Sequence, residues 1–266
     1  MNAATIPVLD LSRLGPPIGA RLVVVGGCGG IGRTLVRAAL STGLKVAVLD
    51  LPTSLGNHPP PKGCIQHEID ATNEESVNRA FSAVANEWGG TDALVNLCGF
   101  TNDFEPVGSL DSKTWDDVVA GNLRAAFLCA RAALPLLEKA GGGAIVNAAS
   151  GLAYKGLPGT SPYGAAKAGV IAMSKSLANE TAPHIRVNVI APGAVDTAFL
   201  RGGTSRTGED ESHATHIDTE RYAEATPLGR LAITEDVVAP ILFLCGDASR
   251  FMTGQVLHIN GGGYMP

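Results

Sequence analysis

The stretch Val25-Gly26-Gly27-Cys28-Gly29-Gly30-Ile31-Gly32 joins an apolar run at 21–25 to a helical pattern at 31–42. Glycine lets the backbone turn sharply and approach a pyrophosphate closely, and the start of the following helix offers free N–H groups and a positive dipole end. A glycine string by itself also fits an ordinary tight turn. Because a strand precedes this string and a helix follows it, the sequence favours a dinucleotide phosphate site.

Outward from this loop, short apolar runs alternate with longer helical patterns. Several runs are nearly continuous Val, Ile and Leu, as expected of strands that are covered on both faces. The alternation predicts parallel strands with right-handed helical crossovers. We therefore expect an α/β fold, a three-layer doubly wound parallel sheet (Rossmann fold) with about seven strands and helices on both faces. The runs are 21–25, 44–49, 63–69, 92–98, 143–148, 185–190 and 254–260, and the helical patterns are 31–42, 73–88, 112–138, 162–181 and 234–246.

A single Rossmann-type domain, 1–266, is predicted, because no repeat, long linker or change of composition divides the 266 residues. Residues 1–19 are expected to form an N-terminal lead-in. Segment 198–226 follows the sixth strand, where an insertion in an open α/β sheet covers the ligand site, so it predicts a substrate-covering segment. A plain surface loop is the alternative. Pro135 should kink or end the helix at 112–138.

Charge and cysteine content exclude several classes of protein. The net charge is −5 and the 20 basic residues are scattered, so no nucleic-acid or anionic-membrane surface is predicted. No apolar run approaches the ~18 residues of a membrane span, and the first residues do not resemble a secretory signal. The five cysteines are far apart, with no CxxC pair, so neither a metal site nor a disulfide framework is expected. Reduced cysteines predict a cytoplasmic protein.

Asp50 ends the second apolar run, 18 residues after Gly32. A carboxylate there accepts hydrogen bonds from both hydroxyls of an adenosine ribose and repels a 2′-phosphate. No basic residue follows it, and Arg33 alone is weak support for NADP. The sequence therefore favours NAD as the cofactor, and the alternative is an aspartate that merely ends a strand.

Tyr163 and Lys167 are four residues apart in a helical pattern, so their side chains share one face with Cβ atoms ~6 Å apart. A nearby ammonium should lower the pKa of the phenol from about 10 toward neutrality and make it a general acid/base. Such a pair is also common on protein surfaces. Ser150, 13 residues earlier, follows the fifth strand, where its hydroxyl can hydrogen-bond a substrate oxygen.

Taken together, these motifs resemble the short-chain dehydrogenase/reductase family, from roughly Ala20 to Gly263. The glycine loop matches the family's TGxxxGxG, and Asn96-Leu97-Cys98-Gly99 matches its NNAG. The Asn of its central helix matches Asn122, and its Ser, Tyr and Lys match Ser150, Tyr163 and Lys167. Its PGxxxT matches Pro192-Gly193-Ala194-Val195-Asp196-Thr197. Val25 replaces the family's usual Thr or Ser, and Leu97 and Cys98 replace Asn and Ala, which should cost some rigidity without removing a reactive group.

The resemblance implies Asn122, Ser150, Tyr163 and Lys167 as catalytic residues. Asn122 would anchor a water through its backbone carbonyl, and Lys167 would hold the nicotinamide ribose. Asp70 would lie at the adenine, and Thr197 at the carboxamide. The implied cofactor-binding residues are Gly26, Gly29, Gly30, Ile31, Asp50, Leu51, Asp70, Ala71, Asn96, Cys98, Gly99, Tyr163, Lys167, Pro192, Gly193, Val195 and Thr197.

The expected function is NAD-dependent interconversion of a small secondary alcohol and its ketone by hydride transfer. Two alternatives stay open: a 3-oxoacyl-type reductase, and a catalytically silent NAD-binding sensor or scaffold. The resemblance also implies a homo-oligomer, a tetramer. Candidate substrate-pocket residues are Phe100, Asn102, Phe104, Leu152, Ala153, Tyr154, Leu157, Phe199 and segment 198–226, in which Arg201 and Arg206 could meet a carboxylate.

Overall fold

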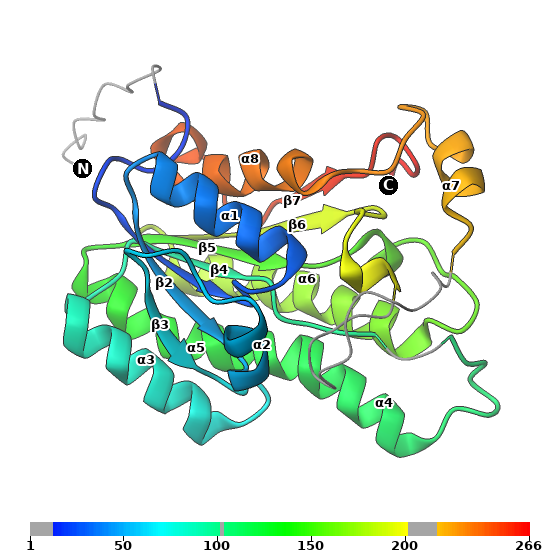
Figure 1. Cartoon of the computed structure of the whole chain (residues 1–266), viewed down its shortest axis with the longest axis horizontal. Helices are drawn as coiled ribbons and strands as arrows, with labels where there is room; N and C mark the ends of the chain where they lie inside the picture. The colour runs from blue at the N-terminus through cyan, green and yellow to red at the C-terminus, as the bar shows by residue number, and fades with distance from the viewer. Residues whose placement is uncertain (1–12, 102–103, 202–216) are drawn as a thin grey trace.

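The computed structural model describes residues 13–101, 104–201 and 217–266. They form a parallel seven-stranded sheet with the strand order β3-β2-β1-β4-β5-β6-β7. Helices cover both faces of this sheet, so the molecule has three layers (Figure 1). The predicted doubly wound α/β fold is confirmed. The strands are β1 (Arg21–Val25), β2 (Lys45–Asp50), β3 (Ile65–Glu68), β4 (Ala93–Asn96), β5 (Gly143–Ala148), β6 (Ile185–Pro192) and β7 (Val256–Ile259).

The pleat of the sheet divides the core into two layers. Val24 of β1 and Val146 of β5 face α1 (Gly30–Ser41) and α8 (Thr234–Cys245) on one side. Their sequence neighbours Val23 and Ile145 face the other side, with α3 (Glu74–Trp88), α5 (Ala125–Lys139) and α6 (Ser161–Thr181). Successive strand residues point to opposite faces, so strands covered on both sides must be apolar throughout. This explains the nearly continuous apolar runs of the sequence.

Helix boundaries follow from short-range polar contacts. Asn73 caps α3 by accepting a hydrogen bond from Ser76 N, and Gly89 ends that helix in the left-handed conformation. Asp111 caps α4 (Ser112–Val119) and Asp218 caps α7 (Thr219–Ala225) in the same way. By contrast, no side chain caps α1, and its first turn contains no acidic residue. The start of α1 is thus left available to an anion.

The predicted helix 112–138 is wrong as one continuous α-helix. The structure divides it into α4, a π-helical segment at Ala120–Arg124, and α5. Pro135 does not end the helix, because α5 continues to Lys139. The sequence pattern also missed α2 (Pro52–Asn57) and α7, both too short to give a clear helical period. Pro52 at the first helical turn was the available signal for α2.

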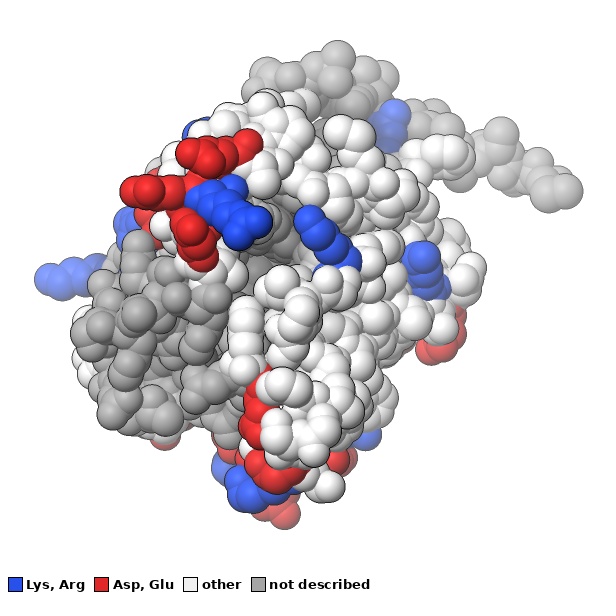
Figure 2. Space-filling view, turned by 90° about the vertical axis from the view of Figure 1, so that its right-hand side faces the viewer, with Lys and Arg blue, Asp and Glu red and all other residues white. Residues whose placement is uncertain are grey.

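The two segments predicted outside the regular fold are only partly described. Residues 1–12 of the lead-in and 202–216 of the covering segment lie outside the described residues, as do 102–103. The flanks of the covering segment are a 3₁₀ turn at Ala198–Arg201 and α7. Within the described ranges, no helix is both long and apolar enough to cross a membrane. On the face of the molecule that carries α7, basic side chains lie apart, and the densest charged groups mix both signs (Figure 2).

The Arg186 side chain joins β6 to the end of α8. Its Nη1 donates to Leu244 O at 3.0 Å and to Ser249 Oγ at 2.9 Å, and its Nη2 donates to Gly246 O at 3.0 Å. These carbonyls belong to the last turn of α8 and the residues after it, which have no partner within the helix. Ser249 donates to the same two carbonyls, so the partly buried guanidinium and Ser249 together supply the donors at this helix end.

We expect Arg186→Met to lower the free energy of unfolding by about 2 kcal/mol, because it removes several partly buried hydrogen bonds from a charged donor. Urea unfolding followed by circular dichroism measures this effect. Arg79→Met is the matched control, since Arg79 makes only a 4.0 Å surface pair with Glu75 and should change stability by less than about 0.5 kcal/mol. Equal effects of the two substitutions would contradict the role of Arg186.

Candidate active site

A cavity of about 510 Å³ opens at the carboxyl ends of the strands, around the point where the order reverses between β1 and β4. Ligands of open α/β sheets bind in this crevice. The cavity is lined by loops that follow β1, β2, β3, β4, β5 and β6, so segments far apart in the sequence meet there. It collects Ser150 and every predicted cofactor-binding residue except Asn96.

The glycine loop is shaped as a cradle for phosphate. Gly26 has a φ of +80°, which favours glycine, and a Cβ at Gly32 would collide with the Gly26 carbonyl oxygen. The loop ends at the uncapped start of α1, where Gly30 and Ile31 line the cavity. These backbone groups and this dipole end fit the pyrophosphate of a dinucleotide.

Asp50 lies at the end of β2, beside the glycine loop. Its Oδ2 accepts from Cys28 N and its Oδ1 from Leu51 N, both at 2.8 Å, so its carboxylate is held toward the cavity that it lines. Burial raises the pKa of Asp50 above its ordinary value, and these hydrogen bonds oppose the rise. Arg33 also lines this end of the cavity and donates to Cys28 O at 3.4 Å. Sequence reasoning missed Ser54, whose hydroxyl also bonds the Asp50 carboxylate.

The loops after β3 and β4 complete the floor of the cavity. Asp70 and Ala71 line it, and Asp70 Oδ1 accepts from Thr72 N at 2.9 Å. Asn96 does not line the cavity: it is only 2% exposed, and its Oδ1 accepts from Cys98 N and Cys98 Sγ, so its contact with the cofactor stays a prediction. Asn96 therefore positions Cys98, which does line the cavity together with Gly99.

Asn122 lies in the π-helical segment, buried behind the cavity wall. Its Nδ2 donates to Phe100 O at 2.7 Å and to Val118 O at 2.8 Å, and so ties the loop after β4 to α4. A Cβ at Gly99 would collide with Asn122 Oδ1 and lie 3.0 Å from Lys167 Nζ. Only glycine therefore fits between these two side chains. The water-anchoring role of Asn122 stays a prediction.

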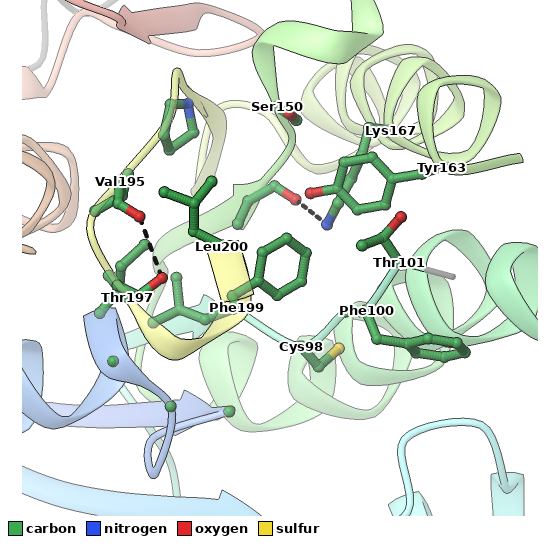
Figure 3. Close-up of a pocket in the computed structure, with 18 of the residues that line it drawn as sticks. Cys98, Phe100, Thr101, Ser150, Tyr163, Lys167, Val195, Thr197, Phe199 and Leu200 are labelled. Atoms are coloured by element: carbon green, nitrogen blue, oxygen red, sulfur yellow. Dashed lines mark hydrogen bonds between the residues drawn. The ribbon is translucent and has the colours of Figure 1, made fainter. Parts of the chain in front are cut away.

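Ser150, Tyr163 and Lys167 meet in the wall of the cavity. Tyr163 and Lys167 lie one turn apart in α6 and are 7% and 3% exposed. Ser150 follows β5, and its hydroxyl hydrogen-bonds the Tyr163 hydroxyl. Lys167 Nζ lies 5.6 Å from the centroid of the Tyr163 ring and donates to Ala148 O at 2.8 Å. Figure 3 shows the phenol and the ammonium side by side, turned into the pocket.

The prediction that the pKa of Tyr163 is lowered is wrong when only the groups of this chain are considered. Burial raises the pKa of Tyr163 to about 12, and the hydrogen bond from Ser150 only partly opposes this. Burial also lowers the pKa of Lys167 to about 8. The reason is that desolvation penalises the charged form of both groups, and the lysine donates its hydrogen bond to a carbonyl. Tyr163 is therefore a protonated phenol at neutral pH, ready to act as a proton donor.

The wall opposite Tyr163 comes from the segment after β6. Pro192, Gly193, Val195 and Thr197 line the cavity, and Thr197 Oγ1 donates to Val195 O at 3.3 Å (Figure 3). Of the predicted pocket residues, Phe100, Phe104, Leu152, Leu157 and Phe199 line the cavity, whereas Ala153 and Tyr154 do not. Asn102, Arg206 and the Arg201 side chain lie outside the described part.

Sequence reasoning did not single out two tyrosines of the site. Tyr222 lies in α7, and its hydroxyl accepts from Ala194 N at 3.0 Å. Tyr264 lies near the C-terminus, bonds His258 Nδ1 at 2.8 Å and packs against Gly151. Both line the cavity. Tyr222 belongs to the predicted covering segment 198–226, whereas no local pattern marks Tyr264, which reaches the cavity through the tertiary fold.

Comparisons with known proteins agree with this architecture. A sequence profile described as enoyl-(acyl carrier protein) reductase matches residues 26–264. The chain is 37% identical over 198 residues to the 3-oxoacyl-(acyl-carrier-protein) reductase FabG of Aquifex aeolicus (strain VF5), covering 73% of this chain and 74% of the relative. It is 34% identical to the cis-4-hydroxycyclohexanecarboxylate dehydrogenase of Sinomonas cyclohexanicum, covering 90% and 94%. The solved structure of a Brucella melitensis short-chain dehydrogenase/reductase, described as glucose/ribitol dehydrogenase, matches with a TM-score of 0.82 at 27% identity, covering 95% and 99%.

The fold and site thus define a dinucleotide-dependent oxidoreductase built on a doubly wound sheet. The chain belongs to the short-chain dehydrogenase/reductase family. It is an enzyme that acts on CH–OH groups with a nicotinamide cofactor.

Burial of Lys167 makes a prediction about stability and pH. Between its folded pKa of about 8 and the unfolded value of about 10.4, the unfolded chain binds more protons, so this group raises the stability of the wild type as pH rises. Lys167→Met has no such proton. We expect the stability of the variant minus that of the wild type to be largest near pH 7 and to fall toward pH 10.

Thermal unfolding at several pH values measures this difference. Lys175→Met is the matched control, because Lys175 is an exposed residue of the same helix. A stability difference for Lys167→Met that is constant from pH 7 to 10 would show that the buried ammonium is not destabilised.

Proposed function

We propose that this enzyme interconverts a small secondary alcohol and its ketone, using NAD. The observation that carries the proposal is the buried cluster of Ser150, Tyr163 and Lys167 beside the glycine cradle. When bound, the nicotinamide cofactor supplies the chemistry of accepting or giving a hydride. The residues of this chain then have to hold the substrate oxygen, move its proton and exclude water.

Tyr163 is the residue that transfers the proton. In the direction of ketone reduction, its hydroxyl donates a proton to the substrate oxygen, which fits a phenol that burial keeps protonated. In the direction of alcohol oxidation, the same oxygen must first be a phenolate, which then accepts the substrate proton and becomes a phenol. Positive charge beside the ring favours that phenolate. Lys167 supplies such charge from 5.6 Å. Ser150 supplies a second hydrogen bond that orients the substrate oxygen.

The substrate end of the cavity supports a compact, largely apolar substrate. Phe104, Leu152, Leu157 and Phe199 line it, and the rings of Phe199 and Tyr163 lie 6.0 Å apart. Leu200 and Tyr222 lie in the described flanks of the predicted covering segment, and both line the cavity. We propose that segment 198–226 covers bound substrate and excludes water.

The choice of NAD rests on Asp50. Its carboxylate is held toward the cavity by two backbone N–H groups, where a 2′-phosphate would meet a negative charge. Burial already makes this carboxylate costly to ionise, so a second negative charge next to it would be more unfavourable still. Ribose hydroxyls, in contrast, offer it hydrogen bonds.

A 3-oxoacyl reductase is the second candidate, because relatives such as the Aquifex aeolicus protein are named as such. The Sinomonas cyclohexanicum relative, in contrast, is named for oxidation of a cyclic alcohol. Assaying secondary alcohols and ketones beside a 3-oxoacyl thioester, with NADH and NADPH, distinguishes the two. A homotetrameric assembly and a cytoplasmic location stay predictions.

Tyr163→Phe should reduce turnover by at least ~10²–10⁴-fold while NAD still binds, because it removes only the transferable proton. Steady-state kinetics and calorimetric titration with NAD measure the two effects. Tyr154→Phe is the matched control, since Tyr154 is 43% exposed and does not line the cavity. A Tyr163→Phe variant that keeps most of its activity would refute the proton-transfer role.

Asp50→Asn should weaken NAD binding and relax the discrimination against NADP by about tenfold or more, because it removes the charge but keeps an acceptor for one of the two backbone N–H groups. The measurement is kcat/KM for both cofactors. Asp247→Asn, outside the cavity, serves as the control. If the wild type uses NADPH more efficiently than NADH, the argument from Asp50 fails.

A further inference from the structure

Two cysteine thiols meet beneath the floor of the cavity. Cys98 follows β4, is partly exposed and lines the cavity (Figure 3). Cys129 lies in α5 and is 0% exposed. Cys98 packs against the apolar core cluster that contains Cys129, and the two side chains hydrogen-bond each other. All five cysteines lie in the described part of the chain and are free, and the other three show no such contact with a second thiol.

The surroundings of the pair shift the pKa values of the two thiols in opposite directions. The hydrogen bond from Cys129 holds the pKa of Cys98 below its ordinary value; burial opposes this, and the charge of Lys167 supports it. The same hydrogen bond and burial raise the pKa of Cys129 well above its ordinary value. In its thiol form, Cys98 Sγ donates to Asn96 Oδ1 at 2.7 Å. Because the pKa of Cys98 is lowered and that of Cys129 is raised, the sulfur that faces the cavity loses its proton more readily than the sulfur behind it.

A thiolate is the reactive form of cysteine toward oxidants. We propose that Cys98 is a site of oxidation by hydrogen peroxide, and that Cys129 then closes a disulfide with it. The cavity gives a small oxidant access to Cys98, while Cys129 is reached only through Cys98. This arrangement of one accessible sulfur and one buried partner is what a reactive and a resolving cysteine require.

The reaction balances in two steps. The Cys98 thiolate attacks one peroxide oxygen, so that an S–O bond forms, the O–O bond breaks, and the released hydroxide takes a proton to become water. Cys129 Sγ then attacks the Cys98 sulfur: the S–S bond forms, the S–O bond breaks, and hydroxide leaves as water with the Cys129 proton. Two thiols are oxidised, and one hydrogen peroxide is reduced to two waters.

The disulfide should inactivate the enzyme. Cys98 would give up its contact with Asn96 and move toward α5, away from the cavity. The next residue is Gly99, which fits closely against Asn122 Oδ1 and Lys167 Nζ. A shift of this segment therefore changes the packing around the lysine beside Tyr163.

The test treats the full-length enzyme with hydrogen peroxide and follows thiol content, peptide mass and activity. We expect free thiols to fall from five to three, the peptides of Cys98 and Cys129 to become cross-linked with the loss of two hydrogen atoms, and activity to fall with them. A dithiol reductant should restore both. Cys245→Ala is the matched control, because Cys245 is a buried cysteine outside the cavity, and this variant should behave as the wild type.

Cys129→Ala separates the two steps. Without a resolving thiol, Cys98 should stop at the sulfenic acid, which dimedone traps as a mass-labelled adduct, at a rate at least about tenfold above that of Cys245. Peptide mapping of the wild type provides a test that does not depend on how well this variant folds. Oxidation of other cysteines first, or an oxidised wild type without the Cys98–Cys129 cross-link, would overturn the proposal.

Discussion

The parallel pairing of β1 with β4 is the constraint on which the site depends. β2 and β3 lie on one side of β1 in the sheet. The chain then crosses over, and β4 pairs with β1 on its other side. The loops that leave β1 and β4 therefore diverge to opposite faces of the sheet, and a crevice opens between their carboxyl ends. The glycine loop occupies one side of that crevice, and Cys98 and Gly99 occupy the other. Every functional group discussed above either lines this opening or supports a residue that does.

Burial sets the chemistry of the groups around the crevice. Desolvation raises the pKa of Asp50 and Tyr163 and lowers that of Lys167, so each group carries its charge less readily than it would in water. Local hydrogen bonds counteract this at selected atoms: Cys28 N and Leu51 N at Asp50, and Ser150 at Tyr163. Polar groups in such surroundings interact strongly with any charge that approaches them. A site with buried ionisable groups and a few well-placed hydrogen-bond donors suits an enzyme that moves one proton and one hydride.

Cys98 illustrates how one substitution in a family motif changes what a site contains. The resemblance to the family places an alanine at this position, so a thiol here adds a nucleophile without removing a group from the proposed proton transfer. Its neighbours were already required for other reasons: Lys167 beside Tyr163, and Asn96 at the end of β4. Cys129 adds the second sulfur from α5, and Cys129 and Lys167 both act to lower the pKa of the Cys98 thiol.

The fold class could be predicted from the order of residues alone, because strands buried on both faces must be apolar throughout and helices must alternate with them. The same order also indicated the phosphate loop and the Tyr163–Lys167 pair, since backbone freedom and helical spacing are local properties. Three-dimensional packing alone set the break in helix 112–138, the direction of the Tyr163 pKa shift, and the arrival of Tyr222 and Tyr264 at the cavity. It likewise placed Asn96 behind the wall and Cys98 against Cys129. These features depend on which surfaces exclude water and which distant segments meet, and neither is encoded in a local stretch of residues.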